Sequence, residues 1–177
     1  MLFTSTVVAQ LERIIFASSV LVAFGYVQDQ PFYSIVDNSF DDGRMIRNRV
    51  KLTIPDHLTK PDLHTSSFTA YCQSKIEGEH IAKRIVQTNP SRSVIAARLG
   101  WVNIDDDPGF HWSRTIWLSY RDLIQFFEKA LKAPMNITGT YYVVSNNHRR
   151  WLDISPAKTD LGYIPQDGAR ASAKNNL

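Results

Sequence analysis

Two short, continuous apolar runs constrain the fold of this 177-residue chain more than any other feature. Residues 14–17 and residues 94–97 each lack the alternation of apolar and polar positions that a half-exposed strand shows. Such runs are typical of strands buried on both faces of a parallel sheet. A helical pattern leads directly into the second run, and a helix that feeds a strand is half of a parallel crossover unit. The sequence therefore predicts an α/β fold, with ligands expected beyond the carboxyl ends of the strands, where Ser18 and Ser19 lie.

The predicted helix between these strands begins near Ser67 or Thr69 and runs to about Gln87, before Asn89 and Pro90 end it. Three further elements are expected after the second strand. They are a helix over 120–132 with Ser119 at its capping position, a β-branched and aromatic strand over 140–144, and a short helix over 155–161 that Gly162 caps. This order of elements agrees with an α/β domain.

Residues 28–68 are the least regular part of the chain, with several prolines and an Asp-Gly turn signal. We expect a long irregular insertion here, with a short strand from Val50 to Ile54. A basic cluster over 44–51 fits a solvated loop, because a nucleic-acid surface needs a broader basic field with interleaved aromatic residues. The whole chain, 1–177, is expected to form a single domain, with 101–177 as its smaller, substrate-side portion.

Composition narrows the class of protein further. With 44% hydrophobic and 21% charged residues the chain is ordinary globular protein. The single cysteine, Cys72, excludes an internal disulfide and fits a packing role in a reducing compartment. Glu12 and Arg13 interrupt the apolar N-terminal stretch, and the uncharged residues 14–27 are too few to span a membrane. We therefore expect a cytoplasmic protein without a membrane segment, a nucleic-acid partner or a metal site.

Tyr71 and Lys75 are the residues whose spacing indicates chemistry. One turn apart, they share one face of the predicted helix. A positioned ammonium group favours the deprotonated form of a nearby phenol, so such a pair is suited to acid/base work. Gly78 lies on nearly the same face, where it leaves room for another backbone or a ligand. By itself the spacing is also that of an ordinary exposed pair, so its meaning depends on context.

Six blocks of sequence supply that context. They are Arg13 to Ser19, Tyr71 to Glu79, Arg98 to Gly100, Trp117 to Asp122, Val144 to Asp153 and Leu161 to Asp167. With these blocks in this order the chain resembles the extended short-chain dehydrogenase/reductase family. Within it the likeness is to the NAD-dependent epimerase/dehydratase group, above all to uronate dehydrogenase-like proteins. The resemblance implies an incomplete Rossmann-like parallel sheet with flanking helices, matching the C-terminal two-thirds of a family member.

The resemblance also implies a function, an oxidoreductase or epimerase acting on a sugar acid or another polyol-like substrate with NAD or NADP. Tyr71 would be the catalytic acid/base, Lys75 would support it and bind the nicotinamide ribose, and Ser19, rather than Ser18, would orient the substrate oxygen. Hydride would pass between a substrate carbon and the nicotinamide. The cofactor contacts implied are Ser18, Tyr71, Lys75, Gly100 and Trp101, and the substrate contacts are Ser19 and Arg114. No metal is required.

Three departures from the family leave a second interpretation open. The eight glycines include no Gly-rich phosphate-binding turn. Val20 and Leu21 stand where the family usually has polar residues, and the separation between Ser19 and Tyr71 is longer than usual. The alternative is a catalytically idle, truncated relative, either a binding or regulatory protein or the product of an incomplete gene.

Self-association is a further expectation. Family members often dimerise through the tyrosine-bearing helix, and Ile76, Ile81 and Ile85 fit either that contact or packing against the sheet. A truncated sheet would also expose a strand edge, which favours association between copies.

Overall fold

The structure, a computed structural model, describes residues 11–29, 32, 59–61, 66–109 and 112–170. Three expectations lie outside these residues: the strand over 50–54, the basic cluster over 44–51 and most of the irregular stretch over 28–68.

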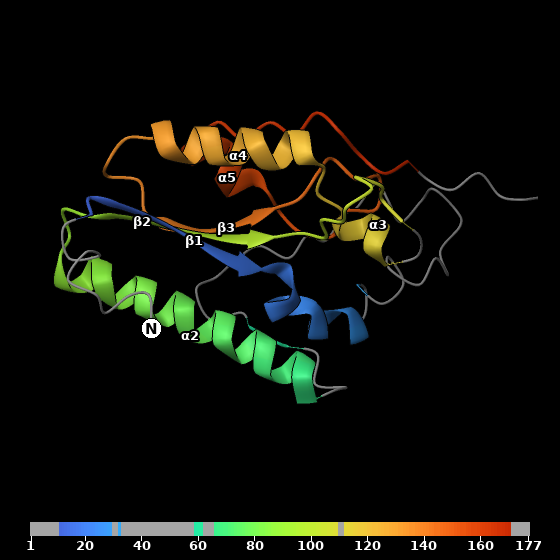
Figure 1. Cartoon of the computed structure of the whole chain (residues 1–177), viewed down its shortest axis with the longest axis horizontal. Helices are drawn as coiled ribbons and strands as arrows, with labels where there is room; N and C mark the ends of the chain where they lie inside the picture. The colour runs from blue at the N-terminus through green and yellow to red at the C-terminus, as the bar shows by residue number, and fades with distance from the viewer. Residues whose placement is uncertain (1–10, 30–31, 33–58, 62–65, 110–111, 171–177) are drawn as a thin grey trace, which may run out of the picture.

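The described residues form three layers with a parallel sheet in the middle (Figure 1). The strands are β1 (Arg13–Ser19), β2 (Ser93–Leu99) and β3 (Gly139–Val143), and they lie side by side in that order. Helix α2 (Ser66–Thr88) covers one face, and helices α4 (Tyr120–Lys132) and α5 (Ser155–Leu161) cover the other. A 3₁₀-helix, η2 (Val20–Gln28), follows β1 directly, and a short helix, α3 (Ser113–Ile116), precedes α4. The predicted α/β fold with an incomplete Rossmann-like sheet is confirmed.

A hydrophobic cluster of the described residues includes the space between the sheet and the helices α4 and α5. Ile95 and Ala97 of β2 meet Phe126 of α4 and Leu161 of α5 there, and all four are buried. The apolar periodicity of α4 and the uninterrupted apolar run of β2 therefore serve one core.

Helix α2 packs against the other face through small residues. Cys72, Gly78 and Ala82 are its buried positions, and the ring of Phe16 in β1 occupies the space beside Gly78. A methyl group at Gly78 would overlap that ring. The space at Gly78, expected to admit another backbone or a ligand, is taken by the Phe16 side chain of the sheet, which lets α2 lie close to β1.

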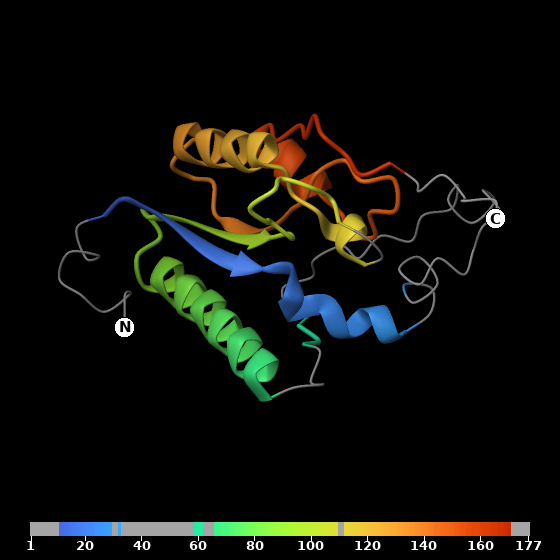
Figure 2. The same cartoon turned by 45° about the vertical axis from the view of Figure 1, so that its right-hand side comes forward.

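Strand β1 differs from expectation in its burial. Ile14, Ile15 and Phe16 are only partly buried and Ala17 is exposed, although the apolar run predicted burial on both faces. The reason is its position, because among the described strands β1 pairs only with β2 and lies at the edge of the sheet (Figure 2). The run is apolar as in a central strand, while one of its sides lacks a described neighbour.

The predicted helices are confirmed and two short ones were missed. In α4 the Ser119 hydroxyl accepts a hydrogen bond from the Asp122 amide at 3.1 Å, and Gly162 ends α5 with a φ of 68°. No periodic pattern predicted η2 or α3. Within the described part of the chain, no helix is both long and apolar enough to cross a bilayer.

Candidate active site

Lys75 is fixed beside Tyr71 at the carboxyl end of β1. Its ammonium nitrogen donates a hydrogen bond to the carbonyl oxygen of Ala17 at 2.9 Å and lies 5.4 Å from the centre of the Tyr71 ring. The centre of the Phe16 ring lies 5.6 Å from the same nitrogen. Tyr71 keeps 43% of its surface exposed. The pair therefore consists of a held cation and a phenol that solvent or a ligand can reach.

Two further contacts align the start of α2 with the residues after β1. The Cys72 thiol donates to the carbonyl oxygen of Leu21 at 3.5 Å, two residues beyond Ser19. The Ser19 hydroxyl accepts from the Leu21 amide at 3.2 Å and so caps η2. In that geometry its own hydrogen remains available for donation. Tyr71, Lys75 and Ser19 thus belong to one region where α2 passes the end of β1.

Ser18 belongs to a buried polar row that crosses the sheet. Ser18, Arg98 and Tyr142 are register partners on the three adjacent strands, and Glu79 of α2 lies over them. The Ser18 hydroxyl donates to Glu79 at 2.5 Å, and the Arg98 guanidinium donates to both carboxylate oxygens at 2.9 and 2.7 Å. Arg98 also donates to the Tyr142 hydroxyl at 3.1 Å. This network, which we call the Glu79–Arg98 network, joins α2 to all three strands.

The charges in this network are mutually compensated. Arg98 is 1% exposed, and burial alone would lower its pKa, but the hydrogen bonds and charge of Glu79 outweigh that effect and raise the pKa above its ordinary value. Burial is the main cause that raises the pKa of Tyr142. The guanidinium therefore stays charged and the phenol stays protonated at neutral pH.

Of the remaining candidate residues, Gly100 and Trp101 follow β2 directly and Arg114 lies in α3. Gly100 is enclosed by backbone, since a side chain there would overlap the carbonyl oxygen of Ile116, and its amide donates to Val143 at 2.9 Å. The side chain of Trp101 is 39% exposed. The Arg114 guanidinium donates to the carbonyl oxygens of Gly109 and Arg170, both at 2.8 Å. Ligand contacts at Gly100, Trp101 and Arg114 stay predictions.

The acidic run over 105–107 forms a turn, as its Asp-Pro-Gly ending indicates. The Asp107 carboxylate accepts from the Gly109 amide at 2.6 Å, and the Asp106 carboxylate accepts from the Tyr120 amide at 2.9 Å. Across the residues that the structure describes, no cluster of three or more potential metal ligands occurs.

Sequence reasoning singled out Tyr71, Lys75 and Ser19 but missed the Glu79–Arg98 network. Glu79 and Arg98 are 19 residues apart, on a helix and the strand that follows it. The available signal was a charged residue inside the otherwise apolar run of β2, because a buried charge requires a partner.

The described residues fit one end of a nicotinamide cofactor and not its middle. Tyr71 and Lys75 offer donors that suit ribose hydroxyls at the end of β1. A pyrophosphate needs close backbone amides at a Gly-rich turn. Gly25, Gly78, Gly100 and Gly168 are each packed against other parts of the described chain, so none of these four frames such a cradle.

Comparison with known proteins shows which sequences the chain is similar to. No protein-family model matches the chain. The NAD-dependent glucose-6-phosphate dehydrogenase of Haloferax volcanii is 32% identical over 100 residues, which are 56% of this chain and 37% of that protein. The uncharacterized protein YtbQ of Bacillus subtilis is 29% identical over 159 residues, 88% of this chain and 54% of that protein. The chain thus spans about a third to a half of these relatives.

Solved structures give the same result at the level of fold. Uronate dehydrogenase from Agrobacterium tumefaciens superposes with a TM-score of 0.64 at 24% identity, and glucuronic acid dehydrogenase from Chromohalobacter salexigens with 0.62 at 25%. Each match covers 89% of this chain and 47% of the solved chain. UDP-glucuronic acid 4-epimerase from Bacillus cereus, solved with UDP-glucuronic acid and NAD, gives 0.51 at 15%, covering 90% of this chain and 58% of that one.

The fold is therefore the one that Rossmann-type NAD-dependent dehydrogenases and epimerases share, and the expected resemblance to the extended short-chain dehydrogenase/reductase family is confirmed. Within that class the structural neighbours are uronate dehydrogenase, glucuronic acid dehydrogenase and UDP-glucuronate 4-epimerase. Complexes with NAD occur among them, in agreement with the expected nicotinamide cofactor. The chain matches about half of the length of each of these solved proteins.

Proposed function

We propose that this chain carries the acid/base and substrate-orienting part of an NAD-dependent oxidoreductase or epimerase that acts on a sugar acid. The observation that carries the proposal is the fixed position of Lys75, which the Ala17 carbonyl holds beside the exposed Tyr71 ring at the end of β1. The named solved relatives that act on uronic acids support this substrate class.

In the oxidation direction each side chain has one task. The Tyr71 phenolate accepts the proton of the substrate hydroxyl as the C–O bond gains double-bond character. The Lys75 ammonium stabilises the phenolate, and the Ser19 hydroxyl donates to the reacting oxygen. The nicotinamide cofactor, when bound, supplies the acceptor for the hydride that leaves the same carbon. Two electrons and one proton thus leave the carbinol as hydride, and one proton passes to Tyr71.

The cofactor part of the proposal is tested by calorimetric titration of the chain with NAD and with NADP. We expect saturable heat with one of them, and weaker binding in a Lys75→Met variant because a cation beside the ribose is lost. Lys132→Met, an exposed lysine on α4, is the matched control and should bind as the wild type does. Absence of heat at millimolar concentrations of both cofactors would rule out an enzyme that works with the chain as given.

A second candidate is a catalytically idle relative that retains ligand binding. It is favoured by the environments of the four enclosed glycines, none of which forms a pyrophosphate cradle in the described part of the chain. This candidate predicts no cofactor heat, while a ligand of the substrate class still binds.

A further inference from the structure

An aromatic surface lies at the same end of the sheet as the candidate active site, and the proposed function does not use it. The rings of Trp101 and Trp112 meet edge to face with centres 5.3 Å apart, and Phe24 contacts Trp112 in the same way at 5.4 Å. Trp101 and Trp112 are each 39% exposed, whereas tryptophan is on average highly buried. We call Trp101, Trp112 and the adjoining Trp117 the tryptophan surface.

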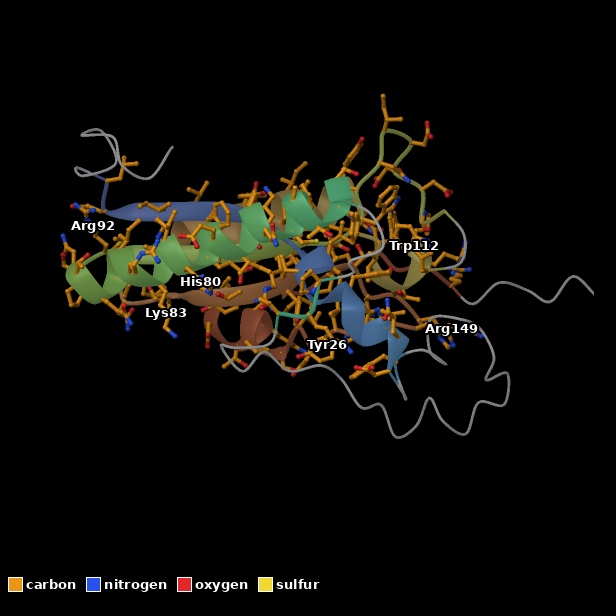
Figure 3. All side chains as sticks on the ribbon, turned by 90° about the horizontal axis from the view of Figure 1, so that it is seen from below. Tyr26, His80, Lys83, Arg92, Trp112 and Arg149 are labelled. Carbon is orange, nitrogen blue, oxygen red and sulfur yellow. The ribbon has the colours of Figure 1, made fainter. Side chains whose placement is uncertain are left out.

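The tryptophan surface lies at the carboxyl end of the sheet. Phe24 belongs to η2, which Ser19 caps, and five residues of 3₁₀-helix place it about 10 Å along the axis from that serine. Trp101 follows β2 by two residues. Figure 3 shows Trp112 at the end of the molecule opposite Arg92, which precedes β2. Ligands of open parallel sheets bind beyond this end.

Trp117 contributes a buried donor with no described partner. Trp101 and Trp117 are bridge partners, so their side chains emerge on the same face. Ile116, Leu118 and Val102, their neighbours along the chain, pack in or against the hydrophobic core, whereas neither tryptophan belongs to it. Trp117 is 6% exposed, and among the described residues its indole Nε1 hydrogen has no acceptor.

An unpaired buried N–H costs about 1–3 kcal/mol, so a persistent one calls for an explanation. The other buried indole of this region follows the rule, since Trp151 Nε1 donates to the Thr115 hydroxyl at 3.2 Å. Because Trp117 Nε1 is itself buried, a ligand oxygen would satisfy it in the same manner only by displacing the atoms that cover it.

We infer that the tryptophan surface is the substrate subsite for a hydroxylated ring, that is, a sugar or sugar acid. The C–H face of such a ring lies on the electron-rich face of an exposed indole, and one ring oxygen or hydroxyl accepts from Trp117 Nε1. Aromatic walls with few placed donors are typical of small-molecule sites. The inference takes its substrate class from the proposed function and assigns Trp101 to the substrate rather than the cofactor.

The four tryptophans of the chain make a direct test available, because each gives one indole N–H resonance in a ¹⁵N-labelled sample. The probe is D-glucuronate, titrated without cofactor, with glycerol as the control for non-specific hydroxyl effects. Saturable shifts are expected for Trp101, Trp112 and Trp117, with the Trp117 signal moving in the direction of a stronger hydrogen bond. Trp151, already paired, should stay in place. Single Trp→Phe variants assign the resonances.

Affinity measurements on variants complete the test. Trp117→Phe keeps a ring and removes the donor, and should weaken binding by about three- to tenfold. Trp101→Ala should weaken it by about tenfold. Ile104→Ala, in the same loop and 89% exposed, is the control and should bind normally. Equal thermal midpoints establish that each variant folds.

The inference is overturned by glucuronate binding that leaves the Trp117 resonance in place, or by no saturable shift of the tryptophan surface. Shifts with glucuronate but no calorimetric heat with NAD would support the inference and reject the enzymatic form of the proposed function. NAD heat with unmoved indoles would do the reverse.

Discussion

The ammonium nitrogen of Lys75 and the carbonyl oxygen of Ala17 are 2.9 Å apart, and this contact fixes the cation at the point where β1 ends. Tyr71 lies one helical turn before Lys75, with its ring centre 5.4 Å from the same nitrogen. Ala17 and Lys75 are 58 residues apart in the sequence, so this contact depends on the fold. The crossover from helix to sheet therefore creates the site.

Replacing Lys75 tests the electrostatic role of this cation. Lys75→Met should reduce turnover by about 10²-fold or more, since general acid/base groups typically contribute that much. Lys75→Arg keeps the charge and should retain more activity than the methionine variant. Initial rates with D-glucuronate and NAD measure both. Equal rates for the two variants would show that the charge is not what matters.

Gly78 is required by packing rather than by helix geometry. Alanine in an open helical position would stabilise the helix by about 1 kcal/mol, but here its methyl group overlaps the Phe16 ring. Gly78→Ala should therefore lower the free energy of unfolding by about 1–3 kcal/mol, as overpacking does. Urea unfolding followed by circular dichroism measures it.

The same substitution can be made in a Phe16→Leu variant, which lacks the aromatic ring. In that background Gly78→Ala should leave the free energy of unfolding unchanged or raise it. Gln73→Ala, at an exposed position of α2, is the control for alanine itself. A loss of stability that persists in the Phe16→Leu background would contradict the packing explanation.

The Glu79–Arg98 network predicts a large effect of removing one charge. Glu79→Gln leaves the guanidinium of Arg98 buried without a counter-charge, and should cost about 3 kcal/mol in unfolding free energy. Glu77→Gln is the matched control, because Glu77 pairs with Arg84 on the exposed side of α2 and its loss should be hard to detect. Equal stabilities of the two variants in urea would contradict the described burial of the network.

Asp167 makes the stability of the α4 start depend on pH. Its carboxylate accepts hydrogen bonds from Arg121 and, at 2.7 Å, from the Ser119 hydroxyl, and the Arg121 bonds are the main cause that lowers its pKa. A carboxyl with a lower pKa in the folded state stabilises above its unfolded pKa of about 4, and this contribution disappears as the pH falls through the folded pKa.

The wild type should therefore lose more stability than Asp167→Asn between neutral pH and pH of about 3. At neutral pH the asparagine variant should be less stable than the wild type, because it lacks the charged carboxylate. Thermal melts at a series of pH values measure both effects. Parallel pH curves for the two proteins would remove Asp167 from this role.

Local sequence patterns were sufficient to predict the helices and strands whose apolar residues follow a regular spacing or a continuous run. Strand β2 and helix α2 were expected almost to their bounds because apolar runs and breakers such as Asn89-Pro90 are local signals. The Tyr71 and Lys75 pair was found for the same reason, since helical spacing is a property of the sequence alone. The common position of this pair and Ser19 followed from the resemblance and the order of elements.

Long-range contacts explain what local patterns could not supply. Asp122 has the spacing of a capping residue, yet its carboxylate accepts from Ser145, Gln166 and Asp167, between 23 and 45 residues away. The burial of β1 depends on how many neighbours it has, which its own residues do not encode. The meeting of Trp101 with Trp112 likewise depends on how the loop between them folds back.

The central claim is that Tyr71 performs acid/base chemistry on a sugar-acid substrate. The most direct measurement is the formation of reduced nicotinamide from NAD and D-glucuronate by the wild type and by Tyr71→Phe, with Tyr120→Phe, an exposed tyrosine on α4, as the control. We predict turnover in the wild type and the control, and a loss of about 10²–10⁴-fold in Tyr71→Phe with unchanged cofactor affinity. Wild-type turnover that survives in Tyr71→Phe, or a wild type without turnover, would contradict the claim.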